Sequence, residues 1–304
     1  MIKKPKVLFI VGPTAAGKTD IGIEIAKRAA GEIISADSMQ IYKEIHIGTA
    51  RPLKEEQQGI LHHLMGFVAP DAEYNVAKYQ KDAKKAIHEI LEKGNLPIVV
   101  GGTGLYVNAL LYNINFSKPP NLMLRKELEN EYDNLGADAL HKRLSLLDPD
   151  AALRIHANDK KRIVRRLEVL AEGEREAYDF RAEKEEAYDA LLVGITKERT
   201  SLYEKINARV DVMIEKGLEK EVRALYEKYG SEIAVFAAIG YKEFLPYFAG
   251  EASLANTITL IKRNTRRFAK RQFTWFHREE DIQWFDTDLQ SKKSIVDQIL
   301  LQLQ

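Results

Sequence analysis

The sequence has no cysteine, almost no net charge and no long apolar run. The absence of Cys among 304 residues excludes disulfides, thiolate nucleophiles and Cys-ligated zinc, and agrees with a reducing cytoplasm. The N-terminal apolar run, Val7 to Val11, is too short for a signal peptide or a membrane span. The chain also lacks internal repeats and low-complexity tracts. We therefore expect a cytoplasmic globular protein with no membrane partner.

The charge that is present is unevenly distributed. Although the formal net charge is +1, two runs are strongly basic: KKRIVRR at Lys160 to Arg166 and KRNTRRFAKR at Lys262 to Arg271. Such runs usually form solvated helix faces, but two of them in a neutral protein indicate a local patch for a polyanion.

Short apolar runs alternate with helical patterns in the first third of the chain. The runs are Val7 to Val11, Ile33 to Ala36 and Leu96 to Val100, and helices are expected at about 20–30 and 76–93. This alternation predicts a parallel sheet covered by helices on both faces. Ligands bind beyond the carboxyl ends of such strands, where three polar or glycine-rich loops follow these runs.

The pattern changes after about residue 115. A Pro-rich joint, FSKPPN, opens a charged helical stretch with no convincing strand, and Leu191 to Ile195 resumes the sheet. We therefore predict an α/β fold with a P-loop NTPase-like parallel sheet flanked by helices and an inserted all-helical domain. The core is expected at 1–115 and 191–304, with the insertion at 116–190. The rest is expected to be mostly helical, in a periodic stretch around 206–229 and in another at 254–276.

The stretch GPTAAGKT has the form G-x-x-x-x-G-K-T, between a predicted strand and a predicted helix. Its glycines let backbone N–H groups point at phosphate oxygens, Lys18 adds a positive charge, and the Thr19 hydroxyl can ligate Mg²⁺. The expected phosphate-binding residues are Gly12, Pro13, Thr14, Ala15, Ala16, Gly17, Lys18 and Thr19. The motif indicates a phosphate or pyrophosphate with Mg²⁺, but not specifically ATP.

Other candidate residues have competing interpretations. Asp37, at a strand end, could hold Mg²⁺ through water, act as a general base or cap a loop. Thr103 in GGTG could reach the same phosphates or belong to a structural turn. His62-His63 favours packing or substrate contact over a metal site, and the pair Trp275-Phe276 could stack on a base but is more often part of a core.

Taken together, these residues closely resemble the bacterial tRNA dimethylallyltransferases, also called tRNA isopentenyltransferases. The matching pieces run in family order over nearly the whole chain: GPTAAGKT, SADSMQIYKEIHIGTARP, HHL, PIVVGGTGLYV, DPDAALRIHANDKKRIVRRLEV, NARVDVMIEKGLEKEV, AIGYKEF and IKRNTRRFAKRQFTWF. The combination is highly specific, although none of the later pieces would be so alone.

The resemblance implies transfer of a dimethylallyl group from its diphosphate to N6 of an adenosine next to the anticodon of tRNA. Pyrophosphate leaves, stabilised by the phosphate loop, Lys18 and Mg²⁺. Asp37 then acts as the base that orients and deprotonates the attacking amine. Thr103 and Arg209, at matching family positions, contact the diphosphate or stabilise its departure.

The same resemblance implies that the insertion holds the anticodon stem-loop while the target base is extruded. The implied tRNA contacts are Ser35, Ala36, Asp37, Ser38, Met39 and Gln40 around the entry for the adenine, and Arg125, Lys161, Arg162, Ile163, Val164 and Arg165 in the insertion. The basic run there would meet the phosphate backbone. Nothing in the sequence demands more than a monomer.

Three alternatives remain at this point. A nucleotide-kinase-like phosphotransferase could use the same loop, but it would need an arginine-rich lid. A prenyltransferase acting on free adenosine phosphates would not need the long insertion. A non-catalytic RNA-binding module with a relic loop is disfavoured by the intact Lys18, Thr19 and Asp37.

Overall fold

The computed structural model describes residues 4–112, 114, 121–173 and 187–303. The chain divides into two compact units, one made of 1–114 and 185–304 and the other of 115–184. The expected limits of the insertion, 116 and 190, differ from this division chiefly at the second boundary. Most of the predicted joint FSKPPN lies outside the described residues.

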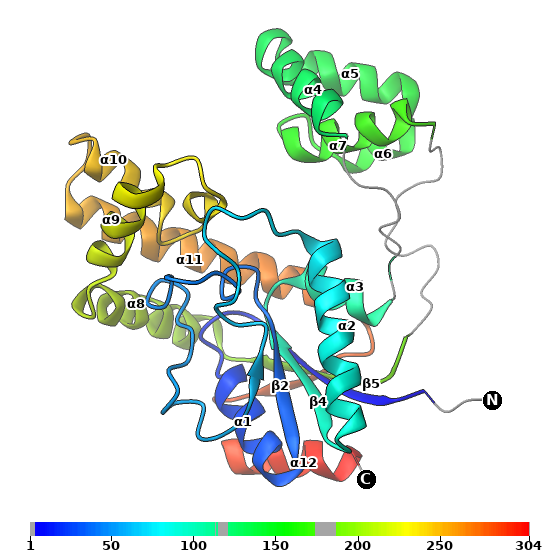
Figure 1. The fold of residues 1–304 in the computed structure, drawn as a ribbon, viewed down its shortest axis with the longest axis vertical. Helices are drawn as coiled ribbons and strands as arrows, with labels where there is room; N and C mark the ends of the chain where they lie inside the picture. The colour runs from blue at the N-terminus through cyan, green and yellow to red at the C-terminus, as the bar shows by residue number, and fades with distance from the viewer. Residues whose placement is uncertain (1–3, 113, 115–120, 174–186, 304) are drawn as a thin grey trace. The chain divides into compact units, whose positions relative to one another are not determined.

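The first unit is built on a six-stranded sheet in the order β3-β2-β4-β1-β5-β6 (Figure 1). All neighbouring strands are parallel, which confirms the predicted fold class. The strands are β1 (Lys6–Val11), β2 (Gly31–Ala36), β3 (His62–His63), β4 (Leu96–Gly101), β5 (Asp189–Thr196) and β6 (Gln283–Asp286). The four expected strands form the centre, and the two edge strands were not predicted.

Side chains of the central strands alternate between two apolar layers. In β1, Phe9 packs with α2 (Val76–Glu92) and α3 (Gly104–Leu111) on one face of the sheet. Its neighbours Leu8 and Ile10 pack with α1 (Lys18–Arg28) and α12 (Lys292–Leu303) on the other. Both layers exclude water completely from these β1 side chains, because a strand buried on both faces must be apolar along its whole length.

The C-terminal helices of the first unit form a third apolar cluster together with Ile41, Tyr42, Ile45 and Val68. Its helices are α8 (Arg199–Glu215), α9 (Leu218–Tyr229), α10 (Leu245–Phe248) and α11 (Leu254–Phe276), with short 3₁₀ turns at Ala234–Ala237 and Lys242–Phe244. The prediction of one periodic stretch over 206–229 was wrong in one respect. Gly217 adopts φ 95°, a left-handed conformation that ends α8 and begins α9.

The described part of the second unit is entirely helical, with α4 (Leu122–Leu135), α5 (Ala137–Leu147), α6 (Pro149–Arg154) and α7 (Lys160–Ala171). Its own core consists mainly of leucines and of Ile163 and Val164 on α7. Across both units, no described helix combines the length and apolar character needed to cross a membrane.

Candidate active site

The phosphate loop joins β1 to α1 and has the backbone conformation that such a loop requires. Gly12 has φ 131°, and a Cβ built there would lie 2.2 Å from the carbonyl oxygen of Ile195 on β5. Gly17 has φ 98° at the start of α1. Ala15 has φ 65°, a conformation that an L-residue adopts only at a cost. These three residues turn the loop around a concave row of backbone groups suited to an anion.

Lys18 is a buried cation of the site whose pKa is strongly lowered. Its Nζ donates to the carbonyl oxygen of Pro13 at 2.7 Å, within its own loop. Burial and the nearby positive charge of Arg209 lower the Lys18 pKa to about 7, with Asp37 opposing the shift. The free site is therefore short of negative charge, as expected for a site that receives an anionic group.

Asp37 follows β2 directly and is held in a defined orientation. Its Oδ1 accepts the backbone N–H groups of Met39 at 2.8 Å and Gln40 at 3.3 Å. Thr103, at the end of β4, accepts the Ser38 N–H through Oγ1 at 3.0 Å. The Asp37 and Thr103 loops are thus bonded to one another. Asp37 Oδ2 has no hydrogen-bond partner among the described residues and can accept a proton from a substrate.

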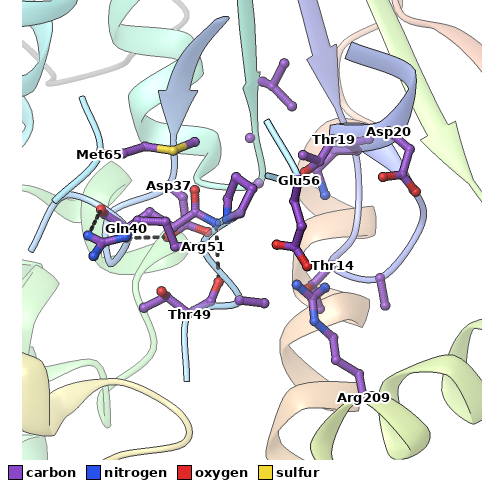
Figure 2. A pocket seen from close by; sticks show the side chains of 18 of the residues that line it. Thr14, Thr19, Asp20, Asp37, Gln40, Thr49, Arg51, Glu56, Met65 and Arg209 are labelled. Atoms are coloured by element: carbon purple, nitrogen blue, oxygen red, sulfur yellow. Dashed lines mark hydrogen bonds between the residues drawn. The ribbon is translucent and has the colours of Figure 1, made fainter. Parts of the chain in front are cut away.

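Two adjoining cavities of about 800 and 370 Å³ meet at these loops. Asp37 and Arg209 line both, as do Thr14 and Ala15 of the phosphate loop. Figure 2 shows Arg209 reaching from α8 toward Thr14 and Glu56, with Asp37 across the cavity. A diphosphate against the loop would therefore have a cation on one side and a carboxylate on the other.

The Thr19 hydroxyl is the one group of the expected phosphate-binding residues for which a magnesium contact was predicted. Thr19 lines the larger cavity at the start of α1. Within the described residues, no three His, Asp or Glu side chains gather as a metal site of their own. Mg²⁺ commonly keeps few protein ligands and takes the rest from phosphates and water.

A second loop, residues 40–51, lines the larger cavity, and apart from Gln40 it was not predicted as part of the site. Arg51 donates through Nη1 to the Tyr42 carbonyl at 2.9 Å. Gln40 donates through Nε2 to the Thr49 carbonyl at 3.2 Å (Figure 2). On α9, Glu221 accepts three consecutive backbone N–H groups, those of His46, Ile47 and Gly48, at 2.8–3.0 Å. Glu221 is far from this loop in the sequence, so no local pattern predicts that it holds the loop in place.

The glycines of GGTG allow close approach of other elements. A Cβ on Gly101 would lie 2.2 Å from the Ala36 carbonyl oxygen, and one on Gly104 would lie 2.2 Å from Trp275 Nε1. Trp275 and Phe276 pack against the core, so the core interpretation of this pair was right. Gln272, which contacts Gly102 and Thr14, was missed because glutamine has no distinctive pattern on a helix.

The histidine pair separates into two roles. His63 Nε2 contacts the carboxylate of Glu32 at 2.7 Å. His62 lines the larger cavity, and its Nδ1 donates to the Ile60 carbonyl at 2.8 Å. Burial lowers the His62 pKa. These are the packing and cavity positions expected for the pair, and no metal cluster forms around them in the described residues.

The residues expected at the adenine entry do not all face the cavities. Asp37 and Gln40 line the larger one, and Ser38 and Met39 line the smaller. Ser35 and Ala36 are 1% and 0% exposed within β2. Their side chains are therefore not available for contact with RNA, which corrects the expectation for these two.

The residues expected to contact RNA in the second unit also differ in exposure. Ile163 and Val164 belong to the buried core of that unit, so their side chains support α7 instead of contacting a ligand. Arg125 and Arg165 pair with the fully buried carboxylate of Glu168 at 2.8 and 2.7 Å. Lys161 and Arg162 are exposed.

A parallel α/β sheet with a phosphate loop, a cavity-facing arginine and an opposing carboxylate defines a P-loop enzyme that acts on a phosphate-bearing substrate. Comparison with known protein families identifies the family within this class of enzymes. Family models described as IPP transferase and isopentenyl transferase match residues 40–279 and 5–66. The chain belongs to the IPP transferase family.

Relatives of the chain carry consistent names. It is 47% identical to a tRNA dimethylallyltransferase of Alkaliphilus metalliredigens, over 98% of this chain and 96% of the relative. It is 50% identical to that of Acetivibrio thermocellus, over 93% and 92%. The solved tRNA isopentenylpyrophosphate transferase of Bacillus halodurans matches 97% of this chain and 94% of its own, with 42% identity and a TM-score of 0.74. A eukaryotic dimethylallyltransferase acting on tRNA matches with 30% identity and a TM-score of 0.81, over 96% and 78%.

Proposed function

We propose that this chain transfers the dimethylallyl group of dimethylallyl diphosphate to N6 of an adenosine next to the anticodon of tRNA. The observation that carries the proposal is the position of Asp37 and Arg209, which line both cavities together with Thr14 and Ala15 of the phosphate loop. The activity is that of the named relatives. A kinase could use the same loop together with an aspartate base, so the names of the relatives decide in favour of carbon transfer.

In the proposed reaction, the amine nitrogen forms a bond to C1 of the dimethylallyl group while the bond from C1 to the diphosphate oxygen breaks. The amine proton passes to Asp37 Oδ2, since Oδ1 is engaged by two backbone N–H groups. Lys18, the loop N–H groups and Arg209 stabilise the negative charge that develops on the departing pyrophosphate. Mg²⁺, held by the Thr19 hydroxyl and the substrate phosphates, would supply further positive charge there.

RNA binding is assigned to the second unit and to the loop after β2. Lys161 and Arg162 are the exposed cations of α7 that can meet phosphates. Arg125 and Arg165 hold the buried Glu168, so we assign them the support of α7. Ser38, Met39 and Gln40 line the entry for the adenine.

One assay tests this function. The protein is incubated with dimethylallyl diphosphate, Mg²⁺ and either an anticodon stem-loop RNA or AMP, and the products are identified by mass. The proposal expects prenylated stem-loop and unmodified AMP. Prenylated AMP alone would favour an adenosine-phosphate prenyltransferase, and phosphate transfer from ATP without prenylation would favour a kinase.

A further inference from the structure

Gln272 on α11 is a buried amide that joins two loops of the cavity. Its Oε1 accepts the backbone N–H of Thr14 at 2.9 Å, and its Nε2 donates to the carbonyl oxygen of Gly102 at 3.0 Å. The residue is 6% exposed. Thr14 belongs to the phosphate loop after β1, whereas Gly102 follows β4. A single side chain therefore spans two loops that come from different strands and meet at the cavity.

The phosphate loop has a reason to need this anchor. Ala15, next to Thr14, adopts φ 65°. A left-handed alanine persists only when its surroundings hold it in place. Because the Thr14 N–H is bonded to Gln272, it acts as a fixed point beside this turn instead of a donor to phosphate. The remaining N–H groups of the loop are then free to face an anion.

The Gly102 end of the Gln272 side chain is connected to Asp37, the proposed general base. Gly102 is followed by Thr103, whose Oγ1 accepts the Ser38 N–H at 3.0 Å. Ser38 in turn follows Asp37. Gln272 is therefore connected through hydrogen bonds and two short pieces of backbone to both the phosphate loop and the Asp37 turn.

Gln272 packs closely against Gly102. A Cβ built on Gly102 would lie 2.1 Å from Gln272 Nε2, and its next neighbour outside that side chain, the Gly12 carbonyl oxygen, would be 3.4 Å away. Gly102 does not have a positive φ, so the glycine is required by the approach of Gln272 and not by backbone conformation.

We propose that Gln272 is a positioning residue, which holds the phosphate loop in its diphosphate-binding conformation and fixes that loop relative to Thr103. The inference rests on the proposed function, in which the loop binds the diphosphate. Gln272 lines the larger cavity, but both ends of its amide are engaged by backbone groups, so we expect it to act through Thr14 and Gly102.

The first test compares Gln272→Leu with Gln80→Leu. Gln80 is a matched control, because it is also a buried glutamine (9% exposed) and bridges two backbone carbonyls, those of Ala109 and Ile114. Both variants lose buried hydrogen bonds and should melt at lower temperature. Only Gln272→Leu should weaken binding of pyrophosphate with Mg²⁺, by about tenfold or more, in titration calorimetry well below melting. Its affinity for stem-loop RNA should stay within about twofold of wild type.

The second test uses the contact with Gly102. Gly102→Ala should displace Gln272 and weaken pyrophosphate binding to a similar extent as Gln272→Ala. Since the shorter alanine at 272 leaves room for the new methyl group, the double variant should bind pyrophosphate about as well as Gln272→Ala alone, so that the two losses do not add.

The outcomes separate the two proposals. If wild-type protein binds pyrophosphate and Gln272→Leu binds it equally well, the positioning role is wrong. The same follows if Gln80→Leu weakens binding as much, or if the Gly102→Ala and Gln272→Ala losses add fully. If wild-type protein fails to bind pyrophosphate, the proposed function fails and takes this inference with it.

Discussion

Asp37 combines a fixed carboxylate oxygen with an open one. Two backbone N–H groups hold Oδ1, which orients Oδ2 toward the cavities without neutralising it. A carboxylate in this arrangement can serve as an acceptor for a proton from an amine that must be aligned before it attacks.

We expect Asp37→Asn to lower kcat by about 10²–10⁴-fold, because the amide keeps the shape of the side chain but cannot take the proton. Steady-state prenylation of stem-loop RNA measures kcat, and calorimetry measures pyrophosphate affinity as the control. Affinity should change little. Turnover within a few-fold of wild type would remove Asp37 from the role of base.

We expect Lys18 to make diphosphate binding dependent on pH. Its pKa is about 7 in the free protein because it is buried and lies near Arg209. Bound diphosphate supplies the missing negative charge and should raise that pKa toward the usual value of about 10.4. Above pH 7, binding must therefore take up a proton at Lys18, and affinity should fall as pH rises.

At pH 8 the wild-type protein should take up about one proton per bound pyrophosphate more than Lys18→Arg, whose guanidinium stays charged. Calorimetry in two buffers of different ionisation enthalpy measures this difference. Equal proton uptake in both proteins would show that Lys18 is already charged in the free site.

At the scale of elements, the 40–51 loop depends on one carboxylate of a different helix. Glu221 on α9 accepts the N–H groups of His46, Ile47 and Gly48 and the hydroxyl of Tyr241 at 2.8–3.0 Å. A carboxylate offers only acceptors, so it satisfies all four donors. A glutamine in its place would direct an NH₂ group, which is a donor, at some of these donors and leave them without an acceptor.

We expect Glu221→Gln to lower the free energy of unfolding by about 1.5–3 kcal/mol, measured by urea denaturation. It should also raise KM for dimethylallyl diphosphate, because Thr49 and Arg51 of this loop line the cavity. Glu227→Gln, at an exposed position of α9, serves as control. A loss of stability no larger than in Glu227→Gln would contradict the anchoring role.

The cations on and beside α7 are of two kinds: Arg125 of α4 and Arg165 of α7 pair with a buried carboxylate, whereas Lys161 and Arg162 of α7 are exposed. Glu168 is fully buried and accepts from Arg125, Arg165 and the Asn121 N–H. These two arginines stabilise the unit, because a buried carboxylate without partners is strongly unfavourable. Lys161 and Arg162 face solvent and can be changed without that cost.

Changing Lys161 and Arg162 together to Ala should reduce the slope of log affinity against log salt for stem-loop RNA by about 2, with the fold kept. The matched control, Lys292 and Lys293 to Ala, removes the same charge from α12. Fluorescence anisotropy over a salt series measures both slopes. Equal slopes in wild type and the α7 variant would exclude this pair from the interface.

For the molecule as a whole, the two units should respond to different ligands. All residues lining the cavities belong to the first unit, whereas the exposed cations of α7 belong to the second. We expect pyrophosphate to slow amide hydrogen exchange in the phosphate loop and α8 but not in α4 to α7. Stem-loop RNA should slow exchange in α7. Hydrogen-exchange mass spectrometry tests this, and protection of α7 by pyrophosphate alone would contradict it.

Much of this architecture could be predicted because its signals are local. Buried strands such as Val7 to Val11 need continuous apolar residues, and the phosphate loop needs glycines at fixed spacing. The short edge strands β3 and β6 were missed because His62–His63 and Gln283–Asp286 lack that continuity. Gln272 and Glu221 were missed for another reason. Their roles depend on partners 258 and 175 residues away in the chain, which spacing within one segment cannot reveal.

The position of β1 has a consequence for the order in which the protein can form during synthesis. β1 pairs along its whole length with β5, and Gly12 fits against Ile195 of that strand. The GPTAAGKT segment leaves the ribosome first, yet its shape depends on β5 and on Gln272, both made after the helical unit. A nascent chain that ends at residue 173 therefore contains the motif but not the strand that packs against Gly12. The contacts within the helical unit are close in sequence, so this unit can fold before β5 and Gln272 have been synthesised and the motif has reached its final shape.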